Sequence, residues 1–118
     1  MNYALFIKHS DPNYLTSYKD PGDPDILLYK TPYFALANEI RIRTMDLINQ
    51  GLTDGEFVLH SKEDCCIIER HWLTEDAARS YADYAIKTHP LFGAPEPIEV
   101  ILKNLITLEE KIIHPVVT

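Results

Sequence analysis

The sequence has little of what a disulfide scaffold, a nucleic-acid binder or a membrane protein needs. Its 118 residues include two cysteines and four glycines, and 18 acidic residues outnumber 11 basic ones, for a net charge of −7. Cys65 and Cys66 are adjacent, so on a strand their side chains point to opposite faces and are poorly placed to bridge each other. Free thiols are typical of a reducing compartment, and we expect a cytoplasmic protein.

Further classes are disfavoured by charge and by hydrophobic pattern. Phosphate backbones and anionic membranes attract clustered Lys and Arg, so we expect no nucleic-acid and no membrane partner. No apolar run approaches the roughly 20 residues of a membrane span, and no basic segment precedes the apolar 3–7 stretch as it does in a leader peptide. The four glycines are too dispersed to form a phosphate-binding loop, and we expect no cofactor.

Hydrophobic residues make up 46% of the chain, enough for one domain over 1–118. Apolar runs predict strands at 3–9, 56–59, 65–72 and 98–102, with a short edge strand at 26–29. Asp-Pro and Pro-Gly signals predict a long loop over 10–25, either a lid or a plain surface excursion. The segment 98–113 fits both strand and helix periodicity; we favour a strand at its start, and within the extension 104–118 the residues 107–113 are helix or a further strand.

Two helices are predicted between these strands. The first begins at Thr31 and Pro32 and ends before Gly51, residues that suit an N-cap, a first turn and a C-terminal stop. The second begins at Thr74 and ends at His89-Pro90. In the first helix we expect an apolar stripe of Leu36, Ile40, Leu47 and Ile48, widened by Ile42 and Met45, with Glu39, Arg41, Arg43 and Asp46 toward solvent.

The element order is strand, helix, strand, strand, helix, strand. This order predicts an α+β protein, a ferredoxin-like βαββαβ sandwich whose antiparallel sheet carries two helices on one face. The other face is left open, and such a face is usually covered by a second copy of the chain or by a ligand. We therefore expect a homodimer, with a small-molecule ligand as the alternative.

The segment 67–90, IIERHWLTEDAARSYADYAIKTHP, carries a family resemblance. A strand that ends in Arg70-His71-Trp72 and runs directly into an N-capped T-E-D-A-A helix resembles the dimeric α/β barrel proteins, which include the antibiotic-biosynthesis monooxygenases. The resemblance implies dimerisation through the open sheet face, with activities that range from cofactor-free oxygenases and isomerases to haem-handling proteins. The long 10–25 insertion departs from the compact family pattern.

The two strands of the predicted hairpin divide their side chains between two faces. If the turn has an even number of residues, one face lies beneath the helices and carries Phe57, Leu59, Cys66, Ile68, Arg70 and Trp72. Arg70 is then expected to reach outward along its stem. The open face then collects Glu56, Val58, His60, Cys65, Ile67, Glu69 and His71. A turn with an odd number of residues would reverse the relation between the two strands and divide these polar side chains between the two faces.

The open face supplies the candidate site. His71 and His60 are candidate general bases, each oriented by Glu69 or Glu56, and these side chains equally fit cross-strand charge pairing or a polar dimer interface. The catalytic candidates are His71, His60 and Glu69, and the binding candidates are Glu56, Trp72, Tyr14 and Tyr18. Because no motif fixes the geometry of these ligand types, we expect no metal. His9 and His89 are expected at the surface.

Two functions follow from this sequence. The first is a small ferredoxin-like domain that acts by self-association or partner binding through its open sheet face. The second is a cofactor-free monooxygenase or isomerase that acts on a small hydrophobic ring compound. A third interpretation, an acidic surface that binds a basic protein, rests on the net charge alone.

Overall fold

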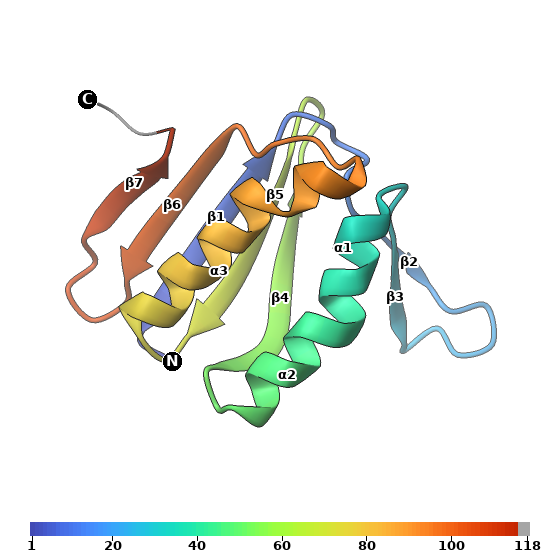
Figure 1. The fold of residues 1–118 in the computed structure, drawn as a ribbon. Coiled ribbons are helices and arrows are strands. Elements are labelled where there is room, and N and C mark those ends of the chain that lie inside the picture. Colours follow the sequence, from blue (N-terminus) through green and yellow to red (C-terminus); the bar gives the residue numbers. More distant parts are fainter. Residues whose placement is uncertain (116–118) are drawn as a thin grey trace.

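The computed structural model describes residues 1–115, and its main feature is a five-stranded antiparallel sheet covered on one face by helices (Figure 1). The sheet order is β4-β5-β1-β6-β7. The strands are β1 Tyr3–His9, β4 Thr53–Ser61, β5 Cys66–Trp72, β6 Glu99–Asn104 and β7 Glu110–His114. This α+β architecture is compatible with a ferredoxin-like fold.

The first helical segment is continuous from Phe34 to Asn49 but changes its winding in the middle. It consists of α1 Phe34–Asn38, a π-helical turn η1 Glu39–Arg43 and α2 Thr44–Asn49. In η1 the backbone N–H of Thr44 donates to the carbonyl of Glu39, five residues earlier. Gly51, at a φ of 73°, ends the segment as predicted. Thr31 lies further out than predicted, and its hydroxyl accepts from the Tyr33 N–H.

The second helix is α3 Glu75–Lys87, followed by the short 3-10 turn η2 His89–Phe92. The Thr74 hydroxyl accepts from the N–H of Ala77, which confirms the predicted N-cap. Its buried face is formed by Ala78, Tyr81, Ala82 and Ala85, which pack on β1, β5 and β6. α3 therefore covers the centre of the sheet.

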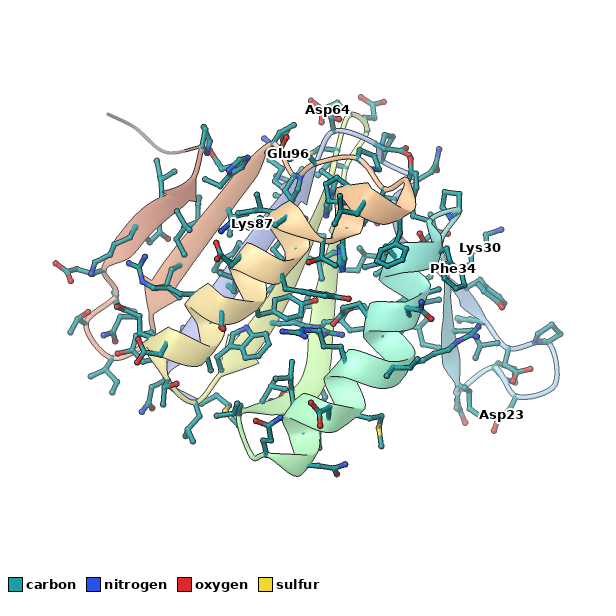
Figure 2. All side chains as sticks on the ribbon, viewed as in Figure 1. Asp23, Lys30, Phe34, Asp64, Lys87 and Glu96 are labelled. Atoms are coloured by element: carbon teal, nitrogen blue, oxygen red, sulfur yellow. The ribbon has the colours of Figure 1, made fainter. Side chains whose placement is uncertain are left out.

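The predicted loop 10–25 is in part a hairpin. β2 Thr16–Lys19 pairs with β3 Leu27–Lys30 as a separate two-stranded sheet, which lies on the far side of α1 from α3 (Figure 1). The predicted edge strand at 26–29 is thus β3, but its partner is β2. Figure 2 shows Asp23 at the tip of this hairpin and Asp64 at the tip of the β4–β5 turn, both projecting outward.

Two apolar clusters fill the space between helices and sheet. One lies under α3 and includes Leu5, Trp72, Tyr81 and Val100. The other lies under α1 and includes Tyr14, Leu15, Leu36 and Ile68. Tyr14 and Leu15 belong to the segment before β2, so that segment serves as part of the core rather than as a surface excursion.

The C-terminal part resolves the ambiguity over helix or strand. β7 pairs with β6, so 107–113 contributes a strand, and of the predicted extension 104–118 only 116–118 lie outside the described residues.

In the first helical segment, the expectation that Ile42 and Met45 widen the apolar stripe is wrong, because both side chains are exposed. Met45 follows Leu36 by nine residues, which at about 100° per residue places it on the opposite side of the helix. Within 1–115 no helix is long and apolar enough to cross a membrane.

Candidate functional site

The open sheet face brings the three catalytic candidates together. The strand register places Val58 opposite Glu69 and His60 opposite Ile67, as an even hairpin turn requires. Oε1 of Glu69 lies 2.9 Å from Nε2 of His60, and Oε2 lies 2.7 Å from Nε2 of His71. One carboxylate therefore holds two imidazoles by separate oxygens.

The electrostatics of this trio depend on partial burial. Burial raises the pKa of Glu69, but the hydrogen bonds from His60 and His71 outweigh it and leave the pKa below its ordinary value. The Glu69 side chain is 19% exposed, whereas that of His60 is 42% exposed and that of His71 is 37% exposed. A carboxylate that stays ionised can orient each ring and stabilise the imidazolium formed when the ring accepts a proton.

Glu56 joins this site through a shallow hollow. The hollow measures about 90 Å³ and is lined by Asp54, Glu56, Phe57, Val58, Glu69 and His71. His60 is outside it, so the two imidazoles lie on different sides of Glu69. The hollow can hold a small polar group beside His71, but it does not enclose one.

The other binding candidates lie elsewhere. Trp72 is fully buried on the helix side of the sheet, with its ring 4.7 Å from that of Tyr81. Tyr14 is also fully buried and stacks on His9 at 3.4 Å. Tyr18 is on β2, with Nζ of Lys30 5.9 Å from its ring. The structure does not bring these three to the open face.

A second polar cluster, which the sequence analysis missed, lies between the helices and the sheet. Glu39 on η1 forms an ion pair with Arg70 on β5, and both side chains are almost completely buried. The Thr44 hydroxyl lies 2.8 Å from Oε1 of Glu39 and 2.7 Å from Nη1 of Arg70. The Tyr81 hydroxyl lies 3.5 Å from the same guanidinium nitrogen. We refer to Glu39, Thr44, Arg70 and Tyr81 as the interior cluster.

Two buried imidazoles accompany the interior cluster. Burial, reinforced by the neighbouring His89 and opposed by Asp11, lowers the pKa of His9 to about 3. The pKa of His89 is also lowered, mainly by burial, although Glu39 works against the shift. Both rings are therefore neutral near neutral pH.

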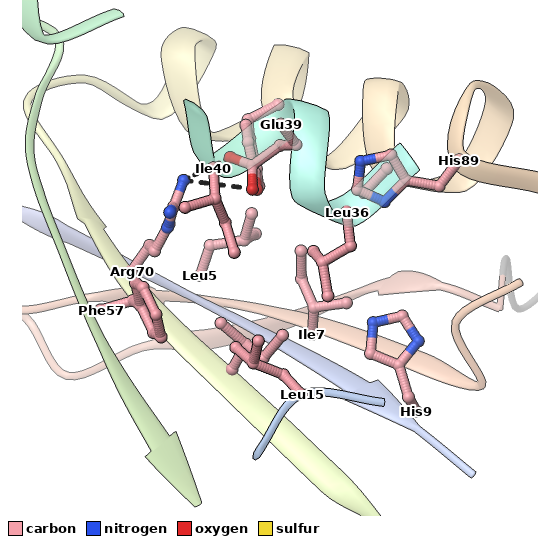
Figure 3. A pocket seen from close by; sticks show the side chains of 13 residues that line it. Leu5, Ile7, His9, Leu15, Leu36, Glu39, Ile40, Phe57, Arg70 and His89 are labelled. Carbon is pink, nitrogen blue, oxygen red and sulfur yellow. Dashed lines mark hydrogen bonds and ion pairs between the residues drawn. The ribbon is translucent and has the colours of Figure 1, made fainter. Parts of the chain in front are cut away.

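A small cavity of about 10 Å³ joins these groups (Figure 3). Glu39 and Arg70 lie toward one end of it, and His9 and His89 lie toward the other (Figure 3). The walls between them are apolar and come from both layers: Leu5, Ile7, Leu15, Leu36, Ile40, Phe57, Ile68 and Ala85. A cavity of this size holds about one water molecule.

Three expectations from the sequence are wrong. Glu39 does not face solvent, because the π turn and the facing Arg70 hold it inward. Arg70 does not reach outward, because its partner lies on the helix directly above the strand. His9 and His89 are not at the surface, since the segment containing Tyr14 covers one and the tertiary packing of η2 buries the other.

A signal for the interior cluster was present in the sequence. Glu39 sits between Leu36 and Ile40 of the apolar stripe, and Arg70 sits between Ile68 and Trp72 of the apolar strand face. Opposite charges that each interrupt an apolar face are expected to meet if those faces pack together. Neither pattern alone identifies the partner.

No group of three or more His, Cys, Asp or Glu side chains in residues 1–115 is placed to hold a metal ion. Comparisons with protein-family models, curated proteins and solved structures found no match to this chain. The two polar clusters and the open face are therefore the features from which we infer a function.

Proposed function

We propose that the chain acts by self-association, with two copies packing their open sheet faces together. The supporting observation is a row of cross-strand neighbours that runs through all five strands. In sheet order the row consists of Val58, Glu69, Phe6, Ile101 and Ile112. Four of these five side chains are apolar, and Val58 and Ile112 at the ends are about half exposed.

The rows on either side of this apolar row are more polar. One consists of His60, Ile67, Lys8 and Glu99, and the other consists of His71, Ala4, Lys103 and Glu110. An apolar centre with a polar rim is the usual anatomy of a protein interface. Because the rim carries charges of both signs, a two-fold axis can place acidic side chains of one copy near basic ones of the other. A second copy is therefore the occupant that we propose.

The proposal extends to the finer topology. β1, the first helical segment, β4, β5, α3 and β6 would form a ferredoxin-like βαββαβ unit, with β7 as an added edge strand, and two such units would form a dimeric α/β barrel. The observed order β4-β5-β1-β6 supports this assignment. The two unbridged and buried thiols, Cys65 and Cys66, support a cytoplasmic setting.

Light scattering coupled to size-exclusion chromatography tests the dimer. We expect twice the monomer mass for the wild type at micromolar concentration. Ile101→Lys places a charge in the apolar row and should yield a monomer, because an unpaired charge is costly at an interface core. Ile42→Lys is the matched control on the exposed helix face and should remain dimeric. A wild-type monomer at every concentration would overturn the proposal.

A second candidate function is favoured by the hydrogen bonds that join Glu69 to His60 and His71. In a face-to-face dimer Glu69 would lie within this row and the two imidazoles beside it, and all three side chains would be shielded from water. His71 would then accept a proton from a small hydrophobic ring compound, with Glu69 stabilising the imidazolium, in a cofactor-free monooxygenase or isomerase.

Turnover assays test this candidate separately. Oxygen uptake and isomer formation are measured with hydroxylated ring compounds, and His71→Gln should lose at least about a hundredfold in rate, the usual contribution of a general base. His114→Gln, which alters an imidazole near Glu96, is the control. Equal rates for wild type and His71→Gln would exclude His71 as the base.

A further inference from the structure

The cavity between helices and sheet is surrounded by buried polar atoms that have no hydrogen-bond partner within residues 1–115. They are Oε2 of Glu39, Nε of Arg70, Nδ1 of His9 and Nε2 of His89. All four residues line the cavity, and each is at most 3% exposed. Burying a polar atom without a partner is unfavourable, so a set that converges on one cavity indicates a missing partner. This arrangement does not involve the open sheet face.

We propose that this cavity is the binding site for a small, neutral molecule with an apolar body and a hydroxyl group. We expect the ligand to be neutral because the charges around the cavity already balance. Glu39 and Arg70 neutralise each other, and the two imidazoles are neutral. A charged ligand would be buried without a counterion, which is strongly unfavourable.

The hydroxyl group follows from the hydrogen-bonding capacity of the unpartnered atoms. An ionised carboxylate only accepts, so Oε2 of Glu39 requires a ligand donor. A neutral imidazole nitrogen either donates or accepts, according to its tautomer. A hydroxyl both donates and accepts, and therefore can donate to Oε2 of Glu39 and accept from the Nε–H of Arg70, which lies at the same end of the cavity. The apolar body is required by the walls, to which Phe57 contributes a ring.

The size of the cavity indicates how the ligand gains entry. At about 10 Å³ the site is too small for more than a water molecule, so part of the wall must move. Leu15 is the one lining residue that belongs to neither the five-stranded sheet nor a helical segment. Its segment is fastened to the helical layer by the Tyr33 hydroxyl, which donates to Oδ2 of Asp11 at 2.7 Å. We expect this segment to shift when the ligand binds.

The wild-type protein tests the proposal with three probes of similar size. Phenol carries the hydroxyl, toluene lacks it, and benzoate replaces it with a charge. Nuclear magnetic resonance titration should show phenol binding at least about tenfold more tightly than toluene, since a hydrogen bond to a charged group contributes that much, and benzoate binding most weakly. The largest shifts should lie at Leu15, Leu36 and Ala85.

Variants localise the effect. Ala85→Leu fills the cavity without altering a polar group and should abolish phenol binding; Ala85→Val serves if the larger side chain prevents folding. Tyr33→Phe releases Asp11 and should speed phenol association while leaving its preference over toluene unchanged. Equal affinity for phenol and toluene, no phenol binding, or shifts confined to Val58, Glu69 and His71 would each overturn the proposal. Because the dimer test uses the open face alone, either proposal can fail without the other.

Discussion

The two polar clusters use similar chemistry in opposite surroundings. On the open face Glu69 holds two imidazoles that are more than a third exposed, whereas in the interior Glu39 holds a guanidinium that is almost fully buried. Water screens the first cluster and is nearly excluded from the second. Exposed ion pairs contribute little to stability, while loss of one partner from a buried pair leaves an unpaired charge in a medium of low dielectric.

The difference in exposure assigns different roles to the two clusters, a structural role to the interior cluster and a role in binding or catalysis to the open-face cluster. The interior cluster is costly to disturb, because Glu39, Thr44 and Arg70 depend on one another for their hydrogen bonds. The open-face cluster can change its protonation without threatening the fold, so it remains available for a partner or substrate. We expect mutation and pH to distinguish the two clusters clearly.

The largest expected effect comes from breaking the interior ion pair. Arg70→Met leaves the Glu39 carboxylate buried without its counterion and should lower the free energy of unfolding by about 3–5 kcal/mol. The double variant Glu39→Leu/Arg70→Met removes both charges and should recover most of that loss. The free energy of unfolding of both variants is measured by urea titration, with circular dichroism as the signal.

The surface pair of Asp83 and Lys87 provides a control for this comparison. It lies on α3 with both side chains more than half exposed. Asp83→Ala should change the free energy of unfolding by no more than about 0.5 kcal/mol. If Arg70→Met were equally mild, the buried pair would not be important for stability, and the contrast between the clusters would fail.

The next largest effect is a loss of stability in mild acid. The pKa of His9 falls from 6.5 in the unfolded chain to about 3 in the folded one. Between these values the unfolded chain binds a proton that the folded chain does not, so the free energy of unfolding decreases as pH falls. From pH 6.5 to 4.5 His9 alone should account for roughly 2 kcal/mol, and His89 acts in the same direction.

Urea titrations at fixed protein concentration over this pH window provide the measurement. His9→Gln should reduce the slope of the free energy of unfolding against pH by about one proton. Asp11 and Glu69, whose pKa values are lowered, add to the loss only near and below their ordinary values of 3.8 and 4.5. A stability that does not vary between pH 6.5 and 4.5 would contradict burial of neutral imidazoles.

The same contrast explains what could be predicted from the sequence. The α+β class, the hairpin pairing and the contents of the open face follow from local patterns, since alternation over a strand fixes which side chains share a face. Cap residues such as Thr74 and Gly51 likewise act within a few residues of their own position. Glu69, His60 and His71 are close in sequence, so the hairpin alone brings them together.

The interior cluster depends on contacts that are distant in sequence. Glu39 and Arg70 are 31 residues apart and meet only when the helical layer packs on the sheet. The inward position of Glu39 also depends on a π turn, which periodicity at 3.6 residues per turn does not anticipate. Burial of His9 requires the ring of Tyr14, from a segment that composition alone describes as a loop.

The smallest expected effect is confined to the open face. The double variant His60→Ala/His71→Ala removes both hydrogen bonds to Glu69, so only the burial that raises its pKa remains, and the pKa of Glu69 should rise. Since that pKa is lowered in the wild type, Glu69 stabilises the fold above pH 4.5 and loses this contribution as pH falls through the folded value. Partial exposure keeps the loss in the double variant at about 1 kcal/mol or less.

Carbon-detected magnetic resonance of the carboxyl groups measures this pKa directly, with His114→Ala as the matched control. His114 pairs with Glu96 through a longer contact of 3.4 Å, so its removal should leave Glu69 unaffected. A pKa of Glu69 that does not change in the double variant would mean that the imidazoles do not act on the carboxylate, and the open-face acid/base set would lose its basis. A stability loss as large as that of Arg70→Met would instead mean that this face is as well shielded from water as the interior.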